Sequence, residues 1–322
     1  MVFHFVVNPA GASGRTGKQF AALKPLLDAS GADIRVHQST PERDIEAVCK
    51  EVLRETQGEE INLVIVGGDG TFNRAVNAVE DFSRVRLGLV PAGSGNDLAR
   101  ALGLAPRPEE VLRVILQGKV QRTLDFGEVV YHNLSDIQPV GRGRKAGDVR
   151  RFAVSCGFGY DAAICQGVEI SRFKPVLNHL HLGKLIYICV AIRLIFTTKL
   201  AELRLDIDGR QQAYHRGLFA VCMNTAYEGG GFRFCPEADG DDGVMDVCIS
   251  NPLHSKMVFF RAFPMAYKGA HVKLRDVFWM ERGRQIRLQA DRPLWVHTDG
   301  EVEGKSSDIT VRVGAQKIRL LM

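Results

Sequence analysis

Two short glycine-rich stretches carry the residue types of a phosphate and metal site. One spans residues 67–71 and reads GGDGT, and the other spans residues 91–97 and reads PAGSGND. Glycines let backbone amides approach phosphate oxygens, and a helix that begins there adds partial positive charge. Asp69 and Asp97 add carboxylates, which are ligands for hydrated Mg²⁺. Together, the two stretches predict a site for a nucleoside triphosphate and magnesium. The alternative is that they are two tight turns of an ordinary α/β sheet.

The elements that must position these stretches alternate between strand and helix over residues 1–124. The pattern predicts strands at residues 2–7, 33–37, 63–66 and 87–90, and helices at residues 17–29, 42–55, 72–79, 97–102 and 108–117. Such alternation predicts a parallel sheet covered by helices, with ligands at the carboxyl ends of the strands. Both glycine stretches follow strands, so both are expected at that edge.

The character of the chain changes near residue 124. Residues 125–305 are expected to form a β-rich second domain of the sandwich type, interrupted by one helical stretch at residues 177–198. Strand-like runs lie at residues 124–131, 151–155, 203–207, 216–223, 245–249, 285–288 and 294–297. The tail, residues 306–322, again has strand character and is expected to return to the first domain. A chain of 322 residues that is 45% hydrophobic can bury two cores.

The overall composition limits the kinds of ligand and the cellular compartment that can be expected for this protein. The net charge of +5 suits anionic surfaces or phosphorylated ligands but is too weak to indicate a nucleic-acid partner. Seven cysteines without a CxxC pair predict buried free thiols in a reducing compartment, and the N-terminus lacks the features of a secretion signal. The most apolar stretch, residues 185–196, is shorter than the roughly 20 residues that a membrane span requires. A cytoplasmic protein is expected.

A third small-residue loop, residues 8–18, resembles a Walker A loop but departs from it. Ala12 stands where the leading glycine is required, and Gln19 stands where Ser or Thr must hold magnesium. The dinucleotide fingerprint fails as well, because Leu98 occupies a position that needs a small residue. The loop still offers amides and hydroxyls, so a phosphate role in a different fold is expected.

Taken together, the Asn8-Pro9 step and the two glycine stretches resemble the diacylglycerol kinase catalytic-domain family, which also includes sphingosine and ceramide kinases. Residues 152–162, 228–232, 236–247 and 298–301 extend the resemblance over nearly the whole chain. In layout it is most similar to the soluble bacterial lipid kinases. The resemblance implies an α/β N-terminal domain with a parallel sheet, of the NAD kinase and diacylglycerol kinase type, followed by an all-β sandwich-like C-terminal domain.

The resemblance also implies roles for individual residues. Asp69 and Asp97 would hold a catalytic Mg²⁺ through water, and Glu301 would be the general base that takes the proton of a lipid hydroxyl. Without the family resemblance, the Asp-Gly-Glu sequence that ends at Glu301 would be interpreted as an ordinary hairpin turn. His297, just before that turn, is a candidate supporting group for the base. The implied ATP contacts are Asn8, Ser13, Gly14, Thr40, Gly67, Gly68, Asp69, Gly70, Thr71, Ser94 and Asn96.

A second, structural metal site is implied at Asp239, Asp242 and the backbone carbonyl of Val244. An acidic surface turn without metal is the alternative, because the spacing does not follow the EF-hand pattern. Arg74 is a departure, since the family often carries a glutamate at that position.

The expected function is transfer of the γ-phosphoryl group of ATP to a lipid hydroxyl, with diacylglycerol as first choice and phosphatidic acid as product. Sphingosine or ceramide kinase, soluble NAD kinase and a non-catalytic binding protein are the alternatives. Replacing Asp69 or Glu301 by Ala is predicted to lower turnover by orders of magnitude and leave folding intact.

The expected partners are ATP, a membrane lipid and an anionic membrane surface contacted peripherally, and a homodimer is left open. Two segments invite the membrane interpretation. The basic loop at residues 139–151 is either a solvated surface loop or a membrane contact. The apolar stretch at residues 177–196 either rests on the bilayer or packs into the core.

Overall fold

The computed structural model describes residues 1–56, 58–139, 143–171, 183–251 and 256–322. The chain forms two compact units. The first contains residues 1–126 and 315–322, and the second contains residues 127–314. The last strand of the chain therefore lies in the first unit, whereas residues 306–314 stay in the second.

The first unit is built on one six-stranded sheet in the order β2-β1-β3-β4-β16-β5. Its strands are β1 (Val2–Val7), β2 (Asp33–Gln38), β3 (Ile61–Gly67), β4 (Val85–Pro91), β5 (Val120–Leu124) and β16 (Ile318–Leu321). Neighbours from β2 to β16 pair in parallel, and β5 pairs antiparallel with β16. The predicted parallel sheet is confirmed, so the carboxyl ends of β1 to β4 share one edge.

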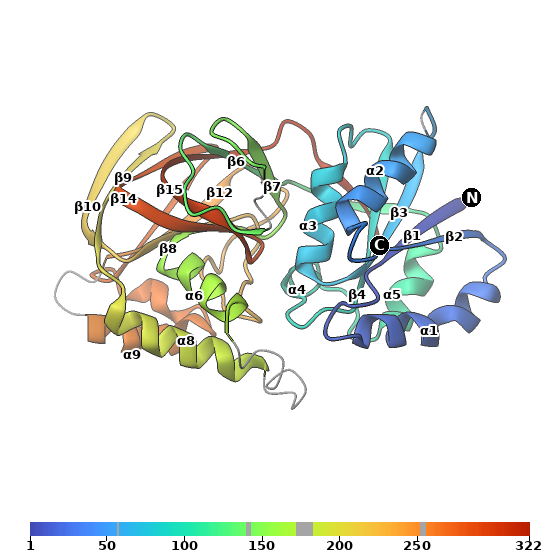
Figure 1. Ribbon diagram of the computed structural model, residues 1–322, viewed down its shortest axis with the longest axis horizontal. Helices are drawn as coiled ribbons and strands as arrows, with labels where there is room; N and C mark the ends of the chain where they lie inside the picture. The colour runs from blue at the N-terminus through green and yellow to red at the C-terminus, as the bar shows by residue number, and fades with distance from the viewer. Residues whose placement is uncertain (57, 140–142, 172–182, 252–255) are drawn as a thin grey trace. The chain divides into compact units, whose positions relative to one another are not determined.

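Helices cover both faces of this sheet. They are α1 (Arg15–Asp28), α2 (Ile45–Glu55), α3 (Asp69–Ala78), α4 (Asp97–Ala101) and α5 (Pro108–Ile115). Leu23 of α1 and Leu112 of α5 join the buried cluster around Phe5, because apolar residues at helical spacing line the faces that meet the sheet. Helices α2 and α3 lie together on the opposite face (Figure 1).

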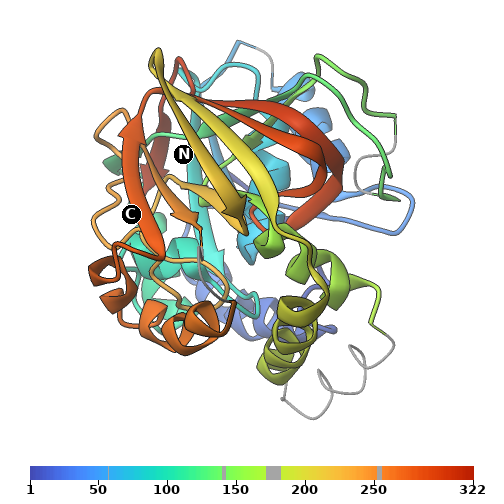
Figure 2. The ribbon, with the colours of Figure 1, turned by 90° about the vertical axis from the view of Figure 1, so that its left-hand side faces the viewer.

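The second unit is a ten-stranded antiparallel sheet, as expected for a sandwich-like domain. Its main path runs β13-β12-β11-β8-β14-β15-β6-β7, and β9 pairs with β14 and with β10. The strands are β6 (Gly127–Tyr131), β7 (Val149–Phe152), β8 (Ser155–Gly159), β9 (Ala201–Ile207), β10 (Arg210–Gly217), β11 (Phe219–Met223), β12 (Met245–Ser250), β13 (Phe278–Gly283), β14 (Gln285–Thr298) and β15 (Glu301–Val313). Figure 2 shows how strongly this sheet curls. One core, including Phe158, Leu205 and Ile286, fills the curve.

A second core in this unit lies between the sheet and three helices, α6 (Tyr160–Glu169), α8 (Gly183–Thr197) and α9 (Lys256–Ala266). The helices lie on one side of the sheet (Figure 1). The predicted helical stretch is seen as α8, and its residues 177–182 lie outside the described residues. Helices α6 and α9 were not expected from the sequence. In the described part of the chain, no helix is both long and apolar enough to cross a membrane.

Some predicted strands are divided differently. The run at residues 124–131 becomes the end of β5 and all of β6, which belong to different sheets. The two runs at residues 285–288 and 294–297 form the single long strand β14, whose register with β15 shifts between Gln289 and Leu294. The two runs were predicted as separate strands, whereas the pairing with β15 continues on both sides of this register shift.

Candidate active site

The two glycine stretches are in direct contact at the carboxyl ends of β3 and β4. These strands pair in parallel with Gly67 opposite Pro91, and the amide of Ala92 donates to the carbonyl of Gly67 at 2.8 Å. A Cβ at Gly68 would lie 2.9 Å from the Cα of Gly93. Because real Cβ atoms do not approach so closely, both positions require glycine. The approach brings α3 and α4 to begin side by side at this edge.

Asp69, the first residue of α3, joins the two stretches through its carboxylate. Its Oδ2 accepts from the amide of Asp97 and its Oδ1 from the amide of Leu98, both at 3.0 Å. These amides belong to the first turn of α4, so Asp69 caps a helix that is not its own. Burial raises the pKa of Asp69, although the amides of Leu98 and Asp97 act to lower it.

Asp97 places a second carboxylate beside the first. Its side chain is buried and forms an ion pair with Arg100. A Cβ built at Gly95 would lie 3.4 Å from Oδ2 of Asp69 and 3.4 Å from Oδ2 of Asp97. One carboxylate oxygen from each aspartate therefore faces the space that glycine leaves open. Two carboxylates around open space suit a hydrated divalent cation.

The amide side chain of Asn96 shapes the loop between the two aspartates. Asn96 has a left-handed backbone, with φ at 54°. Its Oδ1 accepts from the amide of Gly93 at 2.9 Å and its Nδ2 donates to the carbonyl of the same residue at 3.2 Å. The side chain of Asn96 therefore stabilises the conformation of this loop.

The loop after β1 lies against the same edge. Ala12, Ser13 and Gly14 are consecutive left-handed residues, with φ of 49°, 59° and 85°. Helix α1 begins at Arg15 without a side-chain cap. The buried hydroxyl of Thr16 donates to the carbonyl of Ala92 at 2.9 Å, which fixes this loop against the second glycine stretch.

The remaining predicted nucleotide residues follow the same strands. Asn8 comes directly after β1, and its carbonyl accepts from the amide of Gly11 at 3.0 Å. Thr40 comes after β2, and its hydroxyl accepts from the amide of Arg43 at 3.2 Å. Arg15 donates to the hydroxyl of Ser94 at 3.5 Å. All predicted nucleotide contacts in this unit therefore occupy one edge of one sheet.

Arg74, which departs from the family pattern, has a structural partner. It lies in α3 and donates to Oδ2 of Asp44 at 2.9 Å. The other oxygen of Asp44 accepts from the amide of Ala47 and caps α2. Arg74 thus ties α3 to the start of α2.

Glu301, the predicted base, lies in the second unit at the start of β15. It follows a turn in which Asp299 and Gly300 both have a left-handed backbone, with φ of 49° and 83°. Its side chain is 17% exposed, and Oε2 lies 3.1 Å from Nη2 of the buried Arg150. Nε of Arg150 lies 3.2 Å from Oε1 of the buried Glu303. Arg150 therefore links the carboxylate of Glu301 to that of Glu303.

Asp299 anchors this turn. Its carboxylate accepts from three consecutive amides, those of Ala153, Val154 and Ser155, at 2.8 to 2.9 Å. These amides are diverted from the sheet ladder, which explains why the run predicted at residues 151–155 is interrupted between β7 and β8. Sequence reasoning had identified the turn but missed this role.

His297, Asp161 and Glu228 form a cluster next to this turn, in which His297 and Glu228 are buried and Asp161 is partly buried. Nε2 of His297 is 2.7 Å from Oδ2 of Asp161 and 3.0 Å from Oε1 of Glu228. Burial first, and then the charge of Asp161, raise the pKa of Glu228 to about 7. The segments around Asp161 and Glu228 carried the family resemblance, yet neither residue had been given a role.

The loop of the predicted second metal site is engaged in protein contacts. Oδ1 of Asp242 accepts from the amide of Val244 at 3.2 Å, and its other oxygen is paired with Arg282. Nε of Arg282 also lies 3.1 Å from the buried Asp246, whose pKa is raised to about 6, mainly by burial. The carbonyl of Asp239 accepts from the amide of Asp242 at 3.3 Å. An arginine therefore occupies one predicted metal ligand, and a metal at this loop stays a prediction.

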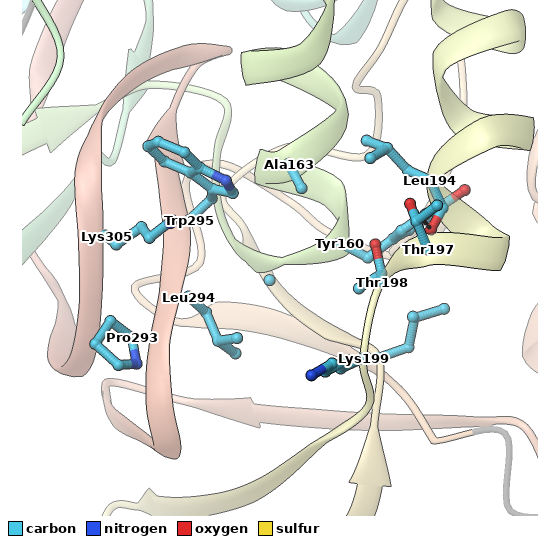
Figure 3. Close-up of a pocket in the computed structure, with 12 residues that line it drawn as sticks. Tyr160, Ala163, Leu194, Thr197, Thr198, Lys199, Pro293, Leu294, Trp295 and Lys305 are labelled. Carbon is cyan, nitrogen blue, oxygen red and sulfur yellow. Dashed lines mark hydrogen bonds between the residues drawn. The ribbon is translucent and has the colours of Figure 1, made fainter. Parts of the chain in front are cut away.

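A cavity of about 230 Å³ opens elsewhere in the second unit, between α6, α8 and the β14–β15 pair (Figure 3). Its walls are mainly apolar, and two lysines, Lys199 and Lys305, line it. The ammonium of Lys305 lies 4.6 Å from the ring centroid of Trp295. The other lining residues are Gly159, Tyr160, Ala163, Leu194, Thr197, Thr198, Leu218, Pro293 and Leu294.

All seven cysteines are free, as predicted, and five of them are buried. Cys165 is partly buried, and Cys189 is exposed on α8, so the expectation of burial was wrong for Cys189. Cys189 is exposed because it lies on the solvent-facing side of α8.

Comparisons with known proteins agree with these observations. Residues 2–129 match the family described as "Diacylglycerol kinase catalytic domain", and residues 154–322 match "YegS C-terminal NAD kinase beta sandwich-like domain". The chain is 26% identical to a protein named diacylglycerol kinase from Bacillus subtilis, over 93% of this chain and 89% of that protein. It is 27% identical to a protein of the same name from Mycobacterium tuberculosis, over 74% and 70%.

A protein named "Probable lipid kinase YegS-like" from Pseudomonas fluorescens is 25% identical over 91% of this chain and 87% of its own length. The crystal structure of a diacylglycerol kinase from Bacillus anthracis matches the fold with a TM-score of 0.65 at 17% identity, covering 99% of this chain and 96% of that one. With both of its halves matched, the chain belongs to the diacylglycerol kinase family of enzymes.

Proposed function

We propose that this kinase transfers the γ-phosphoryl group of ATP to the hydroxyl of a membrane lipid, with diacylglycerol as the acceptor and phosphatidic acid as the product. The observation that carries the proposal is the pair Asp69 and Asp97, whose carboxylates face the same open space at Gly95. Family membership and the relatives named diacylglycerol kinase support the choice of acceptor.

The first unit supplies the nucleotide site. Phosphoryl transfer depends chiefly on alignment and on neutralising the phosphate charge. The glycine loops and the starts of α1 and α3, which have no side-chain caps, offer backbone amides to the phosphates. Asp69 and Asp97 would hold Mg²⁺ through water, and the ion would supply positive charge to the phosphate oxygens.

Glu301 is the proposed base. A carboxylate accepts the proton of the lipid hydroxyl as the oxygen attacks phosphorus. Arg150 holds the carboxylate in place through an ion pair at 3.1 Å. Gly300 leaves space beside Glu301, because among the described residues no atom outside the turn lies within 4 Å of its missing Cβ.

The second unit supplies the lipid surface. Ile188, Ile192 and Phe196 on α8 are 48%, 40% and 64% exposed, and spacings of four place them on one helix face. An exposed apolar helix face beside a mainly apolar cavity suits an amphiphile taken from a bilayer surface. We therefore propose peripheral contact with an anionic membrane through α8. Replacing Ile192 by Asp should weaken sedimentation with phosphatidylglycerol-containing vesicles, whereas Val36→Asp, which adds the same charge at an exposed apolar residue of β2, serves as a matched control.

The decisive experiment presents radiolabelled ATP with a panel of acceptors. Diacylglycerol, sphingosine and ceramide are offered in mixed micelles, and NAD is offered without detergent. We expect label in phosphatidic acid, and we expect it to disappear with Glu301→Gln but not with Glu128→Gln, a carboxylate on β6 that pairs with Arg312. Label in phosphorylated sphingosine or ceramide would favour the sphingoid alternative. Label in phosphorylated NAD alone would refute a lipid kinase.

A further inference from the structure

His297 makes hydrogen bonds through both of its ring nitrogens while its side chain is fully buried. On one side, the amide of Gly300 donates to Nδ1 at 3.2 Å. On the other side, Nε2 lies 2.7 Å from Asp161 and 3.0 Å from Glu228. The imidazole thus bridges the turn that carries Glu301 and the carboxylates of Asp161 and Glu228.

The partners determine which nitrogen carries the proton. A backbone N–H can only donate, so Nδ1 must be the unprotonated acceptor. Nε2 then carries the hydrogen that is directed at Asp161 and Glu228. The hydrogen bond from Gly300 therefore requires the imidazole form that keeps Nδ1 unprotonated and carries its proton on Nε2.

The same three side chains, whose ligand atoms lie within 4.8 Å of one another, have the composition of a metal site. Two observations count against a metal. A cation bound to Nε2 would place the ring hydrogen on Nδ1, where the amide of Gly300 also donates. In addition, Gly157 packs so closely that a Cβ there would clash with both Asp161 and His297. The cluster is therefore better described as a hydrogen-bond network packed against bare backbone.

The charge of the neighbouring carboxylates favours an additional proton in this cluster. Burial alone lowers the pKa of His297, but Cys165, Asp161 and Glu228 raise it well above its ordinary value. Protonation of Nδ1 would break the bond to Gly300. Glu228, whose pKa is raised to about 7, offers another place for the additional proton.

We propose that His297 is a positioning residue, which holds the backbone at Gly300 through Nδ1 and thereby aims the carboxylate of Glu301. Gly300 directly precedes Glu301, so a change in its peptide orientation turns the next side chain. Asp299 and Arg150 hold the two ends of the turn, and His297 holds its middle. The inference rests on the proposed role of Glu301 as the base.

Two isosteric variants separate positioning from packing. In His297→Asn the amide oxygen can occupy the place of Nδ1 and accept from Gly300, but it cannot reach Asp161. In His297→Gln the amide can occupy the place of Nε2 and contact the carboxylates, but it leaves Gly300 without an acceptor. Both variants remove the ring, so they share the cost of a smaller side chain in the core.

Two readouts are compared for each variant. Hydrogen exchange of the Gly300 amide is measured on the whole protein, and kcat and the KM for ATP are measured with diacylglycerol micelles. We expect Asn to keep Gly300 protected and kcat within about fivefold of wild type. We expect Gln to lose that protection and to lower kcat by about 30-fold or more, with an unchanged KM for ATP.

The outcomes are distinguishable. A Gln variant that is as protected and as active as the Asn variant, or more so, would overturn the inference and indicate a packing role. Amide protection that follows the expected order in a protein that phosphorylates no lipid would retain the contact but refute the proposed function, and with it any role in aiming a base. A difference in thermal stability without a difference in exchange at Gly300 would also overturn it.

Discussion

The amide of Asp97 donates to Oδ2 of Asp69 at 3.0 Å, so the two aspartates are bonded to each other as well as placed side by side. The carboxylate of one residue supports the helix that presents the carboxylate of the other. Loss of Asp69 therefore affects both the charge at the site and the position of Asp97.

Substitution at Asp69 should separate these two effects. Asp69→Asn removes the charge but keeps an oxygen that accepts an amide hydrogen, whereas Asp69→Ala removes both acceptors from the start of α4. We expect both variants to lose about 100-fold or more in kcat. The Ala variant should also lose about 1 to 2 kcal/mol in the free energy of unfolding, measured by urea denaturation. The expectation from sequence that folding would stay intact is revised by these contacts, and an Ala variant of unchanged stability would restore it.

Glycine positions in the second stretch should respond differently to a methyl group. A Cβ at Gly93 would clash with Gly68 and with Asn96, whereas a Cβ at Gly95 would lie at ordinary contact distance from two carboxylate oxygens. Gly93→Ala should therefore lower the melting temperature. Gly95→Ala should fold normally but weaken binding of ATP with Mg²⁺, measured by calorimetry. Equal affinity of Gly95→Ala and wild type would show that the cation does not use the space between Asp69 and Asp97.

Asp299 should prove more important for stability than its surface turn suggests. Its carboxylate accepts three backbone amides, and hydrogen bonds to a charged acceptor are stronger than neutral ones. Asp299→Ala should lower the free energy of unfolding by about 3 kcal/mol, with Asn intermediate. Asp291→Ala, in the exposed middle of β14, is the matched control and should change stability by less than about 0.5 kcal/mol.

Glu228 should make the free energy of unfolding decrease as the pH rises from about 5 to about 8. Its pKa rises from 4.5 to about 7 on folding because of burial and the charge of Asp161. Between these values the folded state binds more protons than the unfolded state, so the free energy of unfolding falls as pH rises. Glu228→Gln cannot titrate, and the difference in unfolding free energy between variant and wild type should grow from about pH 5 to about pH 8. Parallel pH profiles for the two proteins would contradict the assignment.

Most of the first unit could be predicted from the sequence, because its signals are local. Helix and strand periods alternate there, and parallel strands place their carboxyl ends at one edge, so residues that follow successive strands must converge. That is why Asp69 and Asp97 could be assigned to one edge from the sequence, whereas Asn8 and Thr40 were assigned to the nucleotide by the family resemblance. The second unit was predicted less completely, since strand signals do not alternate regularly with helix signals there, and α6 and α9 were not expected among them.

The sequence by itself determined the chemistry that the protein can offer: two aspartates among glycines, a glutamate after a turn, and the order of elements that brings the aspartates to one edge. Only the tertiary structure decided how these groups are supported. Asp299 reaches amides 144 to 146 residues away, and His297 meets Asp161 across 136 residues. Contacts of this kind follow from the pairing of β14 with β8, and no local pattern in the chain records which distant amide or carboxylate a buried side chain will meet.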